Sequence, residues 1–191
     1  MRADTTAMTP KANRIVHSIA AGVLIQAQLF AANCSSGFPS AVQWPRPAGW
    51  SEPRGKLFDQ TWRSKDPARF LRVAADFNGD GIEDKASLLA NPSTGHVGLW
   101  LALTYGDRAT SEVLLDEVAD SSVGSEMGIA MVGPGTYETG CGKGYWDCDS
   151  TESAHVAVAH AAIRYFKNES AESFWVWDER KQMMARVWMS D

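Results

Sequence analysis

Basic residues are scarce in this chain relative to acidic ones. The sequence has 18 lysines and arginines against 23 aspartates and glutamates, which gives a formal net charge of −5 at pH 7. The basic residues form no stripe, so the chain is a poor candidate for binding nucleic acid. An acidic surface is better suited to a basic protein partner. The charge therefore favours a protein partner over a nucleic acid.

Recognisable catalytic motifs are missing as well. The sequence contains no G-x-S-x-G, H-E-x-x-H or S-x-x-K motif and no glycine loop of the phosphate-binding kind. Glu169 and Glu172 are close enough in sequence to form a carboxylate pair for glycoside hydrolysis, but an acidic surface turn has the same composition. We therefore expect a protein that is not an enzyme, with a small hydrolase as the alternative.

Long apolar runs are limited to one, residues 15–32. Lys11 and Arg14 precede this run and small residues end it, which is the order found in an export signal. We expect residues 1–33 to be such a signal, with Met8 as an alternative start. A lasting membrane helix is the competing interpretation, and two glutamines inside the run make it weaker.

Cys34 follows the apolar run directly. The sequence Ala31-Ala32-Asn33-Cys34 partly resembles the site at which bacterial lipoproteins are cleaved and lipidated, although Asn33 departs from that pattern. Lipidation of Cys34 and ordinary cleavage nearby both stay open. We expect the protein in the periplasm, either anchored to the outer membrane through Cys34 or free, with secretion as an alternative.

Cysteine is rare, with three in the chain. Cys141 and Cys148 enclose six residues of a glycine-rich stretch, and in an exported protein such a pair is expected to form a local disulfide. The alternatives are a metal site or a nucleophile–base pair with His155 and His160. The cysteine spacing is unusual for zinc, and a disulfide would consume both thiols.

Short apolar runs separated by turn signals fill the second half of the chain. We expect residues 34–66 to be a lead-in rich in proline and tryptophan, with one helical turn near residues 57–62, and residues 67–191 to form one β-rich domain. The spacing predicts a mainly β fold, a single antiparallel β-sandwich or curved sheet with little helix. The expected strands are residues 70–75, 86–90, 96–105, 112–118, 128–132, 156–166, 174–177 and 183–189.

Two stretches of this pattern allow more specific predictions. Residues 174–177 and 183–189 are expected to form a hairpin, with Trp175 and Trp177 on one face and Phe174 and Val176 on the other. We expect these tryptophans to pack in the core, with an aromatic contact surface as the alternative. Residues 156–163 are rich in alanine, so a helix is the alternative to a strand there.

Residues 76–84 carry the most specific motif, D-x-N-x-D-G-x-x-D. Oxygen side chains at alternate positions around a glycine turn are what the hard cation Ca²⁺ requires. The expected ligands are the side chains of Asp76, Asn78, Asp80 and Asp84 and the backbone carbonyl of Ile82. A simple turn between two strands at Asp80-Gly81 is the alternative. Because three carboxylates so close together repel one another, we expect calcium to act mainly as a staple.

The flanks of this loop read as strands, and position 12 is Ser87 rather than glutamate, so a helix–loop–helix calcium hand is not expected. The sequence Val-Ala-Ala-Asp-Phe-Asn-Gly-Asp-Gly, followed by Asp-Lys-Ala, resembles the strand–loop–strand core of FG-GAP or VCBS repeats. One copy is present, and a propeller needs at least four blades, so a propeller is excluded.

Residues 132–139, 141–148 and 186–191 carry a second resemblance, to small exported proteobacterial proteins with a lone FG-GAP-like loop. That group is similar to the periplasmic immunity lipoproteins of bacteria-killing type IV secretion systems, which resemble lysozyme inhibitors. The resemblance implies a non-enzymatic protein that blocks a peptidoglycan-degrading effector. The alternatives are a small cell-wall hydrolase and a structural envelope protein.

An inhibitor of this kind implies a rigid loop that enters the cleft of its target. The loop of residues 140–148 is the candidate, with Lys143, Tyr145 and Trp146 exposed on it for contact with a partner. The plainer interpretation is that this loop is only a connection closed by a disulfide.

Overall fold

The computed structural model describes residues 44–54, 61–63, 66, 68–106 and 109–191. All of them belong to one compact unit, Ser40–Asp191. The expected export signal, Cys34 and residues 57–60 of the expected helical turn therefore lie outside the described residues, whereas residues 61–62 of that turn fall in a 3-10 turn, Thr61–Arg63. Within the described part, no helix is long and apolar enough to cross a membrane.

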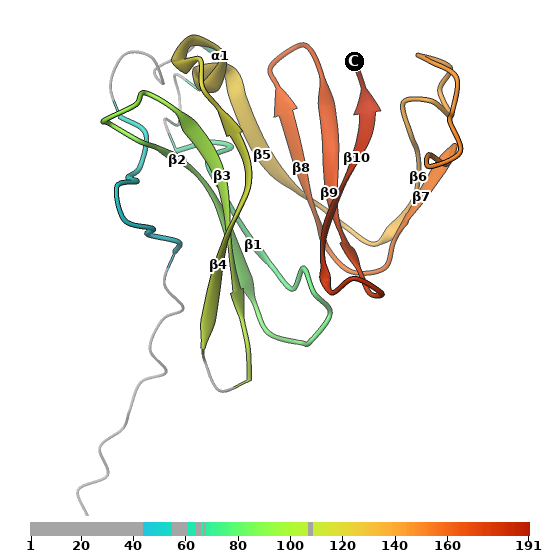
Figure 1. Cartoon of the computed structure of the whole chain (residues 1–191), viewed down its shortest axis with the longest axis horizontal. Coiled ribbons are helices and arrows are strands. Elements are labelled where there is room, and N and C mark those ends of the chain that lie inside the picture. The colour runs from blue at the N-terminus through green and yellow to red at the C-terminus, as the bar shows by residue number, and fades with distance from the viewer. Residues whose placement is uncertain (1–43, 55–60, 64–65, 67, 107–108) are drawn as a thin grey trace, which may run out of the picture. The chain divides into compact units, whose positions relative to one another are not determined.

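The first sheet is an antiparallel meander of four strands (Figure 1). Its strands are β1 (Arg72–Ala75), β2 (Asp84–Ala90), β3 (Val97–Thr104) and β4 (Thr110–Val118). Their order in the sheet is the order in the chain, β1-β2-β3-β4. The 76–84 motif is the connection between β1 and β2, and Ala75 pairs with Asp84 across its base. The expected strand–loop–strand arrangement is confirmed.

The second sheet has the order β10-β9-β8-β5. It contains β5 (Met127–Val132), β8 (Ala162–Lys167), β9 (Glu172–Asp178) and β10 (Met183–Ser190). A separate antiparallel pair is formed by β6 (Gly135–Glu138) and β7 (His155–Val158). The helix considered for residues 156–163 is wrong, because this stretch ends β7 and begins β8. The described helices are short: α1 (Ser121–Glu126) and the 3-10 turn η1 (Thr61–Arg63).

Apolar side chains from both four-stranded sheets meet in one core, which confirms the mainly β, sandwich-like fold. Strand side chains alternate between faces, so every second residue of β8 and β9 points into this core. Trp175 and Trp177 pack there, whereas Phe174 and Val176 lie in a second cluster on the opposite face of the sheet. The β9–β10 hairpin and its two faces are thus as the sequence predicts.

Each sheet also has a covered outer face. On the second sheet, the β6–β7 pair supplies Tyr137 and Val158 to the second apolar cluster. On the first sheet, the lead-in is held by a two-way backbone pairing of Ser51 with Ala90. Trp50 then packs edge-on against Trp100, with 5.5 Å between ring centroids. These coverings explain why both sheets are rich in apolar residues on both faces.

The two sheets are joined on the side of β1 and β5. The amide of Ile129 in β5 donates to the carbonyl of Phe70, just before β1, at 2.8 Å. Nearby, the fully buried guanidinium of Arg63 donates to the carbonyls of Ser125, at 2.9 Å, and Met127. Burial lowers the pKa of Arg63 to about 10. Paired in this way, Arg63 ties the lead-in to the end of α1 and the start of β5.

Candidate functional site

The 76–84 loop, called the carboxylate loop below, folds around its own side chains. The carboxylate of Asp76 accepts two backbone hydrogen bonds, from Gly79 at 2.7 Å and from Gly81 at 2.9 Å. Asn78 and Asp80 each accept the amide two residues further on, at 3.0 and 2.8 Å. Both glycines have positive φ, which lets the chain reverse within this short span. The motif residues therefore shape the loop through their oxygens.

Asp84 closes the loop from the protein interior. Its side chain is fully buried, and its two oxygens accept the amides of Phe77 at 3.0 Å and Thr104 at 2.8 Å. Burial raises the pKa of this carboxyl, with Asp80 adding in the same direction, and the amide bonds oppose the rise. Asp84 is thus a buried acid that joins both ends of the loop to the end of β3.

The oxygens of the carboxylate loop match calcium in chemistry but are not gathered around one point. The donor set is made only of oxygens, and a carboxylate oxygen that accepts one amide keeps a second lone pair, so the donor chemistry fits Ca²⁺. The carboxylates of the described residues are not, however, gathered into a group of three or more that could hold a metal ion. Ile82 lies in the loop, where its amide bonds to Asp80. Calcium at this loop is therefore a proposal, taken up below.

His160 is a neighbour of the carboxylate loop that sequence reasoning did not find. A Cβ atom on Gly79 would lie 2.3 Å from the imidazole of His160, so the ring rests directly against the loop. The Nε2 atom of His160 is 2.9 Å from a carboxylate oxygen of Glu179 in the β9–β10 turn. The amide of Ala161 also donates to the carbonyl of Asp76, at 3.3 Å. The loop is thereby tied to segments more than 80 residues away in sequence.

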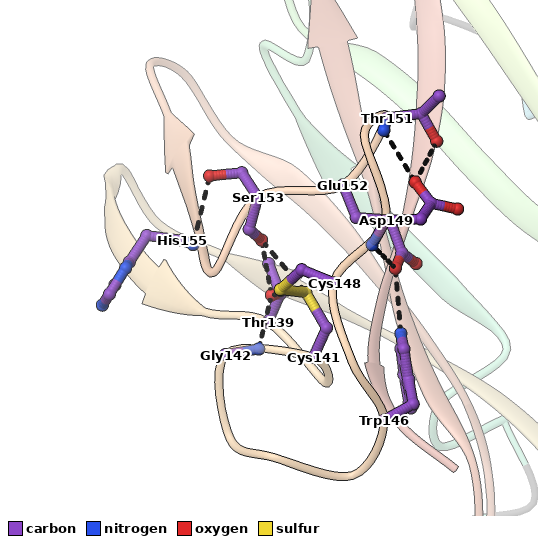
Figure 2. Close-up of a disulfide and its surroundings, with 10 residues drawn as sticks. All are labelled: Thr139, Cys141, Gly142, Trp146, Cys148, Asp149, Thr151, Glu152, Ser153 and His155. Carbon is purple, nitrogen blue, oxygen red and sulfur yellow. Dashed lines mark hydrogen bonds between the residues drawn. A yellow bond between two sulfur atoms is a disulfide. The ribbon is translucent and has the colours of Figure 1, made fainter.

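Residues 140–148, called the stapled loop below, lie within the connection of residues 139–154 between β6 and β7. Cys141 and Cys148 form the predicted disulfide (Figure 2). The thiols are consumed, so the metal site and the nucleophile–base pair with His155 and His160 are wrong. Next to the disulfide, the hydroxyl of Thr139 donates to the carbonyl of Ser153 at 2.6 Å and accepts the amide of Gly142 at 3.2 Å.

Backbone bonds add to the covalent closure of the stapled loop. The amide of Lys143 donates to Thr139 at 2.9 Å, and that of Tyr145 donates to Gly140 at 3.1 Å. Gly140 in turn donates to the carbonyl of Trp188 in β10, at 2.9 Å. The Nζ atom of Lys143 donates to a second β10 carbonyl, that of Met189, at 2.9 Å. The loop is therefore fixed both internally and to the second sheet.

The three residues expected to contact a partner differ in their surroundings. Tyr145 projects, with 60% of its surface exposed. Lys143 is exposed along its chain, but its ammonium group is anchored on β10. Trp146 is only half-exposed, because its ring lies on Gly140 and its Nε1 donates to Glu152 at 3.0 Å (Figure 2). The expected exposure is confirmed for Lys143 and Tyr145 and is wrong for Trp146, and their contact with a partner stays a prediction.

Glu169 and Glu172 do not form an isolated carboxylate pair. Glu172 begins β9 and accepts a hydrogen bond from Arg164 in β8, at 2.7 Å. Glu169 lies in the turn before it, with a positive φ of 56°. The carboxylate of Glu172 is held in a cross-strand ion pair, which is a structural role.

Comparison with known proteins does not assign these loops to a family. No protein-family model, curated protein or solved structure matches the chain.

Proposed function

We propose that this chain is an exported, calcium-stabilised protein of the cell envelope that acts by binding another protein, and most specifically by blocking a cell-wall hydrolase of the lysozyme kind. The observation that carries the proposal is the stapled loop, which presents an exposed Tyr145 on a closed and anchored backbone. Residues 1–33 would direct export, and the lipidation of Cys34 would add an anchor to the outer membrane.

Rigidity is what makes this loop suited to binding. A loop that is already ordered loses little conformational entropy when it enters a cleft, so more of its contact energy appears as affinity. Tyrosine is enriched among the residues that dominate protein interfaces, because it offers a large, rigid, amphipathic surface. The net charge of −5 would also favour the approach of a basic hydrolase.

Calcium would act on a different part of the same domain. Bound at the carboxylate loop, it would supply positive charge to Asp76, Asn78, Asp80 and Asp84 and to the carbonyl of Ile82. The loop's own residues already tie β1, β2 and the end of β3 together. The expected role of the ion is therefore to stabilise the domain, with no part in contact with the partner.

The test uses the full chain and a purified lysozyme-type muramidase with its peptidoglycan substrate. We expect saturable binding with one muramidase per chain by titration calorimetry and a matching loss of peptidoglycan clearing. Tyr145→Ala should weaken binding at least about tenfold, as expected of a residue that dominates an interface. Tyr105→Ala is the matched control, because Tyr105 is also exposed but directly follows β3, outside the stapled loop.

Three results would contradict this function. Clearing of peptidoglycan by the chain alone would make it a hydrolase, the alternative considered from sequence. Equal loss of binding in Tyr145→Ala and Tyr105→Ala would remove the stapled loop as the contact. A chain that neither binds the muramidase nor clears peptidoglycan would favour a structural role in the envelope.

A further inference from the structure

A pocket of about 260 Å³ lies between the lead-in and the outer face of the first sheet. The lead-in is fixed beside β2 by the Ser51–Ala90 backbone pairing, at 2.9 and 2.8 Å, and by Pro45, which is buried. The walls therefore come from two segments, residues 44–54 and the strands β1 and β2. The pocket is part of the folded domain and does not depend on a single mobile side chain.

Positive charge is concentrated in this pocket although the chain as a whole is acidic. Three arginines line it, Arg46, Arg54 and Arg72, against one lining carboxylate, that of Glu52, and beside the pocket the carboxylate of Glu112 accepts the backbone amide of Arg46 at 2.8 Å. Glu52 pairs with Arg72. Arg46 and Arg54 are exposed, and among the described residues neither guanidinium forms an ion pair. Two guanidiniums are thus left for a ligand.

The remaining walls are aromatic. Trp44 contacts two cations, with the guanidinium of Arg72 at 5.0 Å and the ammonium of Lys85 at 5.1 Å from its ring centroid. Trp50 is held in place by its edge-on contact with Trp100. Cation–π contacts of this kind orient both partners, so Arg72 and Trp44 are fixed relative to each other. The pocket combines flat apolar surfaces with guanidinium donors.

The shape and charge select a class of ligand. Guanidinium groups bind carboxylates and phosphates with paired hydrogen bonds, and tryptophan faces pack against flat rings. Pockets for drug-sized ligands are usually about 300–1,000 Å³, so this smaller one suits a molecule with a single ring. We propose that the pocket formed by Trp44, Trp50, Arg46, Arg54 and Arg72 binds a small organic anion, a carboxylate or phosphate carried on one flat ring.

This site is independent of the proposed function. It lies on the outer face of the first sheet, whereas the stapled loop is anchored to β10 of the second sheet. Loss of ligand binding here would leave the binding of a muramidase unchanged, and failure of muramidase binding would leave this site untouched.

The experiment titrates the full chain with four probes and follows the indole ¹H–¹⁵N signals by NMR. Benzoate and phenyl phosphate carry both the ring and the anion, benzamide lacks the charge, and inorganic phosphate lacks the ring. We expect benzoate or phenyl phosphate to shift the signals of Trp44 and Trp50 and to bind at least about tenfold more tightly than benzamide or inorganic phosphate.

Variants then test the arginines directly. Arg46→Gln and Arg54→Gln should each weaken binding of the anion at least about threefold. Arg180→Gln is the matched control, because it removes the same charge from the exposed β9–β10 turn. The melting temperatures of all three variants should match the parent, since these side chains form no ion pair among the described residues.

The proposal is overturned by any of three results. Benzoate and phenyl phosphate that bind no better than benzamide would remove the anion requirement. Inorganic phosphate that binds as tightly as phenyl phosphate would remove the ring. Equal binding by Arg46→Gln, Arg54→Gln and Arg180→Gln would place the site elsewhere.

Discussion

The carboxylate loop and the stapled loop are each held in one conformation, but by different kinds of bond. Both are nine-residue, glycine-containing segments within the connections between paired antiparallel strands, and both contain backbone amides that donate to side-chain oxygens. The stapled loop adds a covalent bond. The carboxylate loop is held by hydrogen bonds from amides to its carboxylates, and those carboxylates repel one another. The order of one loop should therefore depend on redox conditions and the order of the other on cations.

The largest effect is expected at the buried end of the carboxylate loop. Asp84→Ala leaves the buried amides of Phe77 and Thr104 without their acceptor, and each orphaned donor costs about 1–3 kcal/mol. We expect the free energy of unfolding, measured in urea, to fall by about 2–5 kcal/mol. Asp80→Ala is the control, because Asp80 is exposed, and it should cost under about 1 kcal/mol. Equal costs would show that Asp84 does not anchor the loop.

Removing the covalent bond gives the corresponding measurement on the stapled loop. Cys141→Ala combined with Cys148→Ala should lower the free energy of unfolding by about 2–3 kcal/mol, since closing a loop of this length restricts the unfolded chain. Reductant should destabilise the parent by a similar amount and leave the variant unchanged. An unfolding curve of the variant that superimposes on that of the oxidised parent would rule out the disulfide as a stabilising element.

Two glycines of the stapled loop are required for different reasons, one for space and the other for its backbone conformation. A Cβ atom at Gly142 would lie 2.1 Å from the carbonyl oxygen of Ala154, whereas one at Gly144 meets nothing. Gly142→Ala should therefore cost about 1–3 kcal/mol or more from overpacking. Gly144 has a φ of 80°, so Gly144→Ala should cost about 1 kcal/mol. The reverse order in thermal unfolding would contradict the packing described here.

A smaller effect than at Gly142 is predicted where the carboxylate loop meets the second sheet. Gly79→Ala should cost about 1–2 kcal/mol, from a φ of 78° and from contact with His160. In a His160→Ala background the contact part disappears, so the cost should fall to about 1 kcal/mol. A double-mutant cycle in urea measures this difference. Additive costs would show that His160 does not press on the loop.

The sequence was informative where the cause of a structure is local. The strand–loop–strand unit follows from alternating residues on either side of a glycine turn, and the Cys141–Cys148 disulfide follows from spacing. The two faces of β9 follow from the period of two along a strand. Each of these features is set by residues within about ten positions of one another.

Other features were not predicted from the sequence. Either the element is too short to show a pattern, or the residues that meet are far apart in the chain. Helix α1 has only six residues and is set by its cap, where the side chain of Asp120 accepts the amide of Ser122, so it has no periodicity to read. His160 meets Gly79 only after the two sheets are assembled. Likewise, the arginines of the lead-in reach Arg72 only because residues 44–54 fold over the first sheet.

We propose that calcium orders the carboxylate loop, while the stapled loop stays fixed without it. Amide hydrogen exchange of the full chain, measured in calcium and in chelator, tests this most directly. We expect calcium to protect the amides of Gly79, Gly81 and Ile82, with a gain of about 2.7 kcal/mol at a hundredfold excess of calcium over its dissociation constant. Exchange in residues 140–148 should be unchanged. Identical exchange of the carboxylate loop in millimolar calcium and in chelator would show that calcium does not order this loop.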